Sequence, residues 1–105
     1  MKTRSLACGT ALVLAALLPA RAQDAQALQT RSLAATCGAC HGTAGKAIDG
    51  STVPGLAGMP TSHFIEQMKA FKSGARPATI MHQLAKGYSD AQIEAMAAYF
   101  AAQSK

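Results

Sequence analysis

The sequence predicts an all-α domain of roughly three or four helices around a long loop. Residues 61–73 and 89–101 place apolar side chains at the three- and four-residue spacing of amphipathic helices. Residues 42–60 are rich in glycine and proline and predict the loop. Nowhere does the strict alternation of apolar and polar residues indicate a strand. These observations favour one small helical domain.

The first 22 residues have the layout of a secretory signal peptide. Lys2 and Arg4 precede an apolar run over residues 6–18, and the small residues of Ala20-Arg21-Ala22 then suit a cleavage site. We therefore expect residues 1–22 to be removed and residues 23–105 to form one domain in the periplasm. A retained membrane anchor is the alternative, but the apolar run falls short of the about 20 residues that span a bilayer.

The composition excludes several classes of protein. Part of the net charge of +5 belongs to the predicted leader, which contains Lys2, Arg4 and Arg21. No block of Lys or Arg remains to indicate a nucleic-acid partner. Cys8 is expected to leave with the leader. With no tryptophan and 5% aromatic residues, the domain has a thin core. Such a small domain usually needs a disulfide, a metal or a large buried cofactor.

The first half of the domain is expected to hold one helix and the long loop. Residues 24–37 are alanine-rich, with Leu28 and Leu33 as apolar positions and Asp24 as a candidate N-cap. This predicts a short helix that runs into the motif around Cys37. Residues 42–60 then form a loop that is long for so small a domain. Loops of this length usually have a function or wrap around something.

The second half is expected to hold two helices and a short helical turn. The helix over residues 61–73 should end at Gly74, a favourable C′ residue. A loop and a short helical turn follow. Ser89 and Gln92 then form a capping box at the start of the last helix. The expected core positions of these two helices are Phe64, Ile65, Met68, Phe71, Ile93, Met96, Ala97 and Phe100.

The stretch C-G-A-C-H, residues 37–41, carries the chemistry. A structural zinc site needs four ligands, and the domain has no second cysteine pair. A thioredoxin-like couple expects a β-α-β setting, and neither it nor a disulfide explains His41. Covalent haem c explains all three residues: Cys37 and Cys40 form thioethers, and His41 ligates the iron. The haem would also supply apolar mass that the domain lacks.

The sixth iron ligand has several candidates. Met81 stands roughly forty residues after His41, in the expected loop between two helices, and is the favoured ligand. Its neighbour His82 would give bis-histidine iron, and Met59 lies in the loop near the proximal side. His63 is expected to be exposed near a helix start. On the proximal side, we expect the carbonyl of Pro54 to accept a hydrogen bond from the His41 ring.

The same motifs resemble class I c-type cytochromes over essentially all of residues 23–105. The matching segments are "CGACHG", "VPGLAGMP", "HFIEQMKAFKSGAR" and "IMHQLAKGYSDAQIEAMAAYFA". The resemblance implies an α-helical fold whose first and last helices cross, His41/Met81 ligation, and one-electron transfer. The last segment is especially similar to the cytochrome subunit of flavocytochrome c sulfide dehydrogenase and to halves of cytochrome c4. With one CxxCH, this chain would carry one haem.

Three kinds of function remain to be separated. The first is a periplasmic electron-transfer protein, not itself an enzyme. It would accept electrons from an FAD-containing sulfide dehydrogenase, or act as a free c4/c553-type shuttle to a terminal oxidase or reductase. The second is a haem enzyme or gas sensor with a displaceable sixth ligand. Against this class, the sequence around Met81 offers a lone Arg76 and no cluster of His, Arg or Tyr that could act on a bound substrate. The third uses the cysteines without haem, as a structural protein or metallochaperone.

Overall fold

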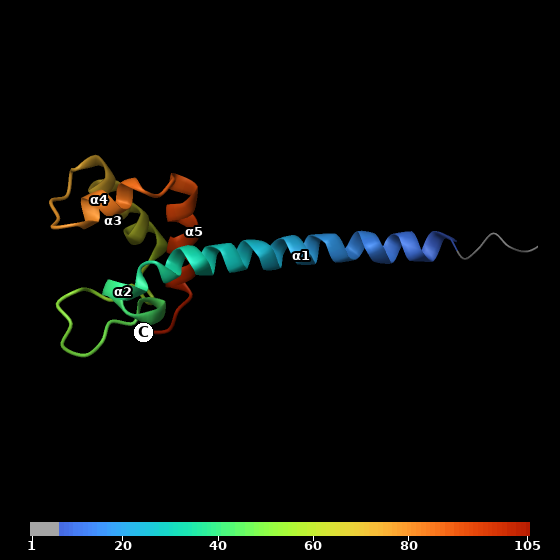
Figure 1. Cartoon of the computed structure of the whole chain (residues 1–105), viewed down its shortest axis with the longest axis horizontal. Helices are drawn as coiled ribbons and strands as arrows, with labels where there is room; N and C mark the ends of the chain where they lie inside the picture. The colour runs from blue at the N-terminus through green and yellow to red at the C-terminus, as the bar shows by residue number, and fades with distance from the viewer. Residues whose placement is uncertain (1–6) are drawn as a thin grey trace, which may run out of the picture.

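The structure, a computed structural model, describes residues 7–105, with their side chains from Arg21 onward. Its elements are one long helix, several shorter helices and turns, with no strand among the described residues (Figure 1). In chain order they are α1 (Ala7–Ala35), α2 (Gly38–His41), the 3₁₀ turn η1 (Thr43–Gly45), α3 (Thr61–Ser73), α4 (Met81–Lys86) and α5 (Asp90–Ala101). The predicted all-α class is confirmed.

The first helix differs from the one expected at residues 24–37. It begins at Ala7 and ends at Ala35, so Asp24 lies inside it and does not cap it. The four residues directly before Asp24, Ala-Arg-Ala-Gln at 20–23, are strong helix formers, so the backbone has no cause to break at Asp24. The basic start of the predicted signal peptide lies outside the described residues, and Cys8 lies where no side chains are described.

The loop over residues 42–60 contains only η1 as regular structure, as expected. It folds back on itself because the carbonyl of Gly45 accepts hydrogen bonds from the backbone N–H groups of Leu56 (2.7 Å) and Ala57 (3.0 Å). The N–H of Gly58 then donates to the carbonyl of Phe100 at 2.8 Å. These bonds fasten the loop to the C-terminal end of α5.

The ends of the later helices follow local rules, with one exception. Gly74 ends α3 in the left-handed conformation (φ +83°), and the capping box of Ser89 and Gln92 begins α5, as predicted. Met81, expected in a loop, is instead the first residue of α4. The helix starts there because the carbonyl of Ile80 accepts hydrogen bonds from the N–H groups of Gln83 (2.9 Å) and Leu84 (3.2 Å).

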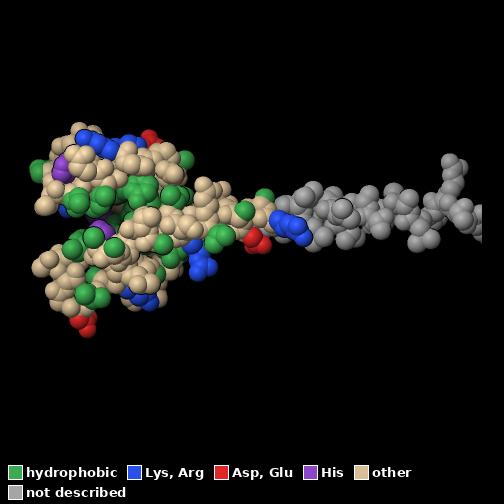
Figure 2. Space-filling model, viewed as in Figure 1, with side chains coloured by type: hydrophobic (Ala, Val, Ile, Leu, Met, Phe, Trp, Pro, Cys, Tyr) green, Lys and Arg blue, Asp and Glu red, His purple; other side chains and the backbone are tan. Residues whose placement is uncertain are grey.

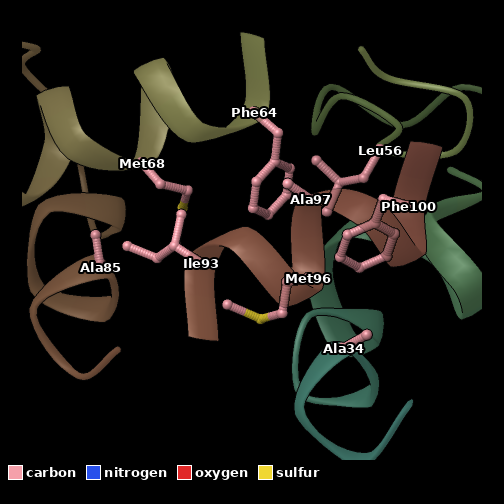
Figure 3. Close-up of a cluster of buried hydrophobic side chains, with 9 residues drawn as sticks. All are labelled: Ala34, Leu56, Phe64, Met68, Ala85, Ile93, Met96, Ala97 and Phe100. Atoms are coloured by element: carbon pink, nitrogen blue, oxygen red, sulfur yellow. The ribbon is translucent and has the colours of Figure 1, made fainter. Parts of the chain in front are cut away.

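A small core forms where α5 packs against both α1 and α3 (Figure 3). Figure 1 shows α5 running across the C-terminal part of α1. The rings of Phe64 and Phe100 lie at its centre, 5.6 Å apart. The buried residues are Ala34, Leu56, Phe64, Met68, Ala85, Ile93, Met96, Ala97 and Phe100. Three of them are alanines, so the core is as thin as the composition predicts.

Gly45 and Gly50 offer a matched pair for testing how closely the loop packs on this core. Both have a left-handed backbone, with φ of +77° and +78°. A Cβ atom at Gly45 would lie 2.8 Å from the N atom of Ala57 and 2.8 Å from Cδ1 of Phe100, whereas at Gly50 it would meet nothing within 4 Å.

We expect Gly50→Ala to lower the free energy of unfolding of the haem-loaded protein by about 1 kcal/mol, through backbone strain alone. Gly45→Ala should lower it by about 3 kcal/mol, because a steric clash is added to the same strain. Urea unfolding of both variants measures the difference. Equal losses would contradict the close packing of η1 on Leu56 and Phe100.

Candidate functional site

The CxxCH motif folds as a single helical turn. Cys37 is the N-cap of α2, and the N–H of His41 donates to the Cys37 carbonyl at 3.0 Å. Residues three and four apart on a helix lie on the same face, so Cys40 and His41 share the face of Cys37. Both cysteines are free thiols, Cys37 half-buried and Cys40 exposed. The turn thus presents two thiols and an imidazole to one side.

The environment of Cys37 argues against a redox couple. Burial raises the pKa of the Cys37 thiol, and the neighbouring hydroxyl of Thr36 only partly opposes this effect. Reactive cysteine couples depend on a lowered thiol pKa and a stable thiolate. Cys37 therefore lacks the lowered pKa that such a couple needs.

His41 is oriented by the long loop. Its Nδ1 atom lies 2.7 Å from the carbonyl oxygen of Pro54. A carbonyl can only accept, so Nδ1 carries the proton and donates it. The other ring nitrogen, Nε2, is then unprotonated and has a lone pair available for a metal. Pro54 lies two residues before Leu56, which is bonded to Gly45, so the loop's own hydrogen bonds hold this carbonyl in place.

Next to this turn, the molecule is hollowed. Figure 2 shows hydrophobic side chains gathered along a hollow between the part built from α3 and α4 and the part that contains α2. A histidine side chain is visible inside it. An apolar hollow beside a polar attachment turn suits a large flat cofactor with a metal centre.

The candidate sixth ligands come from different parts of the molecule. Met81 begins α4, which packs on α3, whereas Met59 ends the loop segment that is bonded to Gly45. Both side chains are half-buried against the core. His82 is half-buried, and its Nδ1 atom is buried with no hydrogen-bond partner. His63 is exposed, as expected.

The two remaining methionines of the domain, Met68 and Met96, are buried in the core, where the sequence placed them. Neither is available as an iron ligand without unpacking α3 or α5. The choice of sixth ligand therefore stays among Met81, His82 and Met59.

One contact near the site was missed by the sequence analysis. The hydroxyl groups of Thr36 and Tyr88 lie 2.6 Å apart, across 52 positions of the chain. Thr36 immediately precedes Cys37 of the attachment turn, and Tyr88 lies between α4 and α5. No pattern in the sequence signals such a pair, because each residue alone is an ordinary polar surface residue.

The residues present fit a covalent haem and disfavour the alternatives. No three His, Cys, Asp or Glu side chains among the described residues come together as a metal site of their own. Cys37 and Cys40 are not joined by a disulfide. What the site offers is two free thiols one turn apart, an imidazole with a fixed tautomer, and an apolar hollow.

Comparison with known proteins agrees with this geometry. The family model of cytochrome c matches residues 26–104, which is most of the chain. The chain belongs to the cytochrome c family. The all-α class I fold and covalent haem c at the CxxCH motif are therefore confirmed. Within the described residues, no helix combines the length and apolar character of a membrane span.

Several relatives are similar to this cytochrome. One is the "Thiosulfate dehydrogenase electron acceptor" of Thiomonas intermedia, which is 40% identical over 64% of this chain and 31% of the relative. Another is the "Cytochrome subunit of sulfide dehydrogenase" of Chlorobaculum tepidum, 36% identical over 70% of this chain and 64% of the relative. "Cytochrome c4" of Pseudomonas aeruginosa is 40% identical over 78% of this chain and 39% of the relative. The chain thus matches less than two thirds of the length of each.

Proposed function

We propose that this cytochrome carries single electrons in the periplasm, with His41 and Met81 as axial ligands, and accepts them from a flavoprotein sulfide dehydrogenase. Bound haem supplies reversible one-electron chemistry between Fe(III) and Fe(II). The chain's own residues hold it through Cys37 and Cys40. The observation that carries the proposed ligation is the hydrogen bond from His41 to the Pro54 carbonyl, which leaves Nε2 of His41 for the iron.

The position of Met81 supports it as the sixth ligand. It stands on α4, in the part of the molecule that faces the attachment turn across the hollow (Figure 2). Met59 belongs instead to the loop segment that is bonded to η1, which packs on α2. A thioether is a soft, neutral ligand that favours Fe(II) and raises the reduction potential relative to bis-histidine iron. With both axial positions filled, no site remains for a substrate, which suits a carrier.

The periplasmic location rests on the predicted signal peptide. Residues 1–22 have a basic start, an apolar run and a small-residue cleavage site. Although α1 continues through Ala22, the contacts of the domain with α1 involve its C-terminal part, which includes the buried Ala34. Removal of residues 1–22 would leave that contact intact.

Mass spectrometry of the protein from a secreting bacterial host should give residues 23–105, to within a residue or two, plus one haem. The haem should stay attached under denaturing conditions, because thioethers do not dissociate on unfolding. A mass that includes residues 1–22 would instead favour a retained membrane anchor.

The Met81→Ala variant tests the sixth ligand. In the oxidised protein, a methionine ligand gives a weak charge-transfer band at the red end of the spectrum. Met81→Ala should abolish this band, lower the reduction potential and open the iron to cyanide. Met59→Ala and His82→Ala are the controls and should both keep the band. Loss of the band in Met59→Ala alone would show that the loop supplies the ligand. No band in the wild type, with a spectral change in His82→Ala, would indicate bis-histidine iron.

The partner is proposed from the relatives. The sulfide dehydrogenase subunit of Chlorobaculum tepidum aligns over a larger share of its own length than the thiosulfate dehydrogenase electron acceptors or cytochrome c4. A free shuttle is the second candidate, because "Cytochrome c-554(548)" of Halomonas halodenitrificans, whose name states no partner, aligns over a still larger share of its length, 84%, at 37% identity.

Purification of the cytochrome from the periplasm of the organism that makes it should distinguish these two roles. As a subunit, it should co-purify with a flavin-bearing chain in a fixed ratio, and sulfide should reduce its haem in that complex. Removing the flavoprotein should abolish the reduction. A cytochrome that purifies alone and is reduced by sulfide no faster than in buffer would be a free carrier.

A further inference from the structure

Tyr88 is a junction between segments that are far apart in the sequence. Its side chain is half-buried, and its hydroxyl lies 2.6 Å from Oγ1 of Thr36. Its backbone carbonyl accepts a hydrogen bond from Nζ of Lys72 on α3 at 2.6 Å. The same ammonium group lies 3.4 Å from a carboxylate oxygen of Asp90, the first residue of α5. Tyr88 thereby joins the residue before Cys37, α3 and the start of α5.

The direction of the hydroxyl bond follows from the proton count. Oγ1 of Thr36 also lies 2.7 Å from the carbonyl oxygen of Leu33, which can only accept. A hydroxyl has one proton, so Thr36 donates to Leu33 and accepts from Tyr88. The Tyr88 hydroxyl is therefore the donor, and removing it leaves the Thr36–Leu33 bond in place.

This bond joins two parts of the molecule that pack on different elements. The helix that carries Met81, α4, packs mainly on α3, whereas α2 packs on η1 and α1. Tyr88 is the second residue after the end of α4, and Thr36 lies directly before Cys37. The bond between their hydroxyl groups thus links the segment of the sixth ligand to the attachment turn.

We propose that Tyr88 is a positioning residue: its hydroxyl, through Thr36, holds α4 at a fixed separation from the attachment turn and so keeps the sixth ligand on the iron. The proposal rests on the ligation by Met81 proposed above. Tyr88 touches neither the iron nor a redox partner in this role. Loss of its hydroxyl should let α4 move away and make the sixth ligand easier to displace.

The test is cyanide titration of the oxidised, haem-loaded protein. Tyr88→Phe should bind cyanide about two- to tenfold more tightly than the wild type, the range expected for one lost hydrogen bond. Its reduction potential should also fall. Thr36→Val should have the same effect, and Thr36→Ser, which keeps a hydroxyl, should behave as the wild type. The double variant Tyr88→Phe/Thr36→Val should bind cyanide no more tightly than the stronger single variant.

Tyr99→Phe is the matched control. Tyr99 is also half-buried, and its ring packs edge-on against Phe100 at 5.2 Å. Its hydroxyl makes no hydrogen bond among the described residues, so cyanide affinity and potential should stay at wild-type values. Unfolding by urea, measured on the same samples, separates a general loss of stability from a local effect at the iron.

Wild-type cyanide affinity in Tyr88→Phe, with or without a loss of stability, would overturn the proposal. So would effects of Tyr88→Phe and Thr36→Val that simply add in the double variant. If Met81→Ala leaves cyanide affinity unchanged while Tyr88→Phe increases it, the Met81 assignment fails. The positioning role of Tyr88 is then supported for a different sixth ligand.

Discussion

The hydrogen bond between Nδ1 of His41 and the carbonyl of Pro54 is the constraint on which the site depends. It fixes both the tautomer and the direction of the ring, and therefore leaves Nε2 as the nitrogen available to a metal. To deliver this carbonyl, the chain must return to α2 within 13 positions. The loop does so by folding on the Gly45 carbonyl and bonding to Phe100 at the end of α5. The long glycine-rich segment thus orients His41 of the CxxCH motif.

The thin core of the domain is also connected with the haem. Its nine buried residues include three alanines, and it contains no buried polar or charged side chain. About 80 residues with so few large apolar side chains bury too little surface to be comfortably stable alone. The hollow lined by hydrophobic side chains indicates where the missing apolar contact lies. Binding of a large apolar cofactor to the folded chain stabilises it by mass action, and covalent attachment prevents its loss.

Local rules predicted most of the fold. The left-handed stop at Gly74 and the capping box at Ser89 depend only on neighbouring residues, so the sequence predicts both. The predicted start of the first helix was wrong, because α1 begins before Asp24 and a favourable N-cap residue inside a helix does not start a new one. Met81 was expected in a loop but begins α4. The sequence did not predict this helix start, because the N-cap residue Ile80 has no side-chain cap that would signal it.

The site divides in the same way. The contact between His41 and the Pro54 carbonyl could be predicted, because a proximal histidine normally donates its ring N–H to a backbone carbonyl and Pro54 lies in the loop that follows the motif. The bond between Thr36 and Tyr88 is invisible to spacing, because it joins two ordinary polar residues whose proximity depends on how α5 crosses α1 and α3. In the proposed site, a contact across 13 positions thus holds the His41 side, and a contact across 52 positions holds the Met81 side. An electron carrier of this kind needs both contacts. Its iron coordination should change little during electron transfer, and this requires that the His41 side and the Met81 side keep a fixed separation.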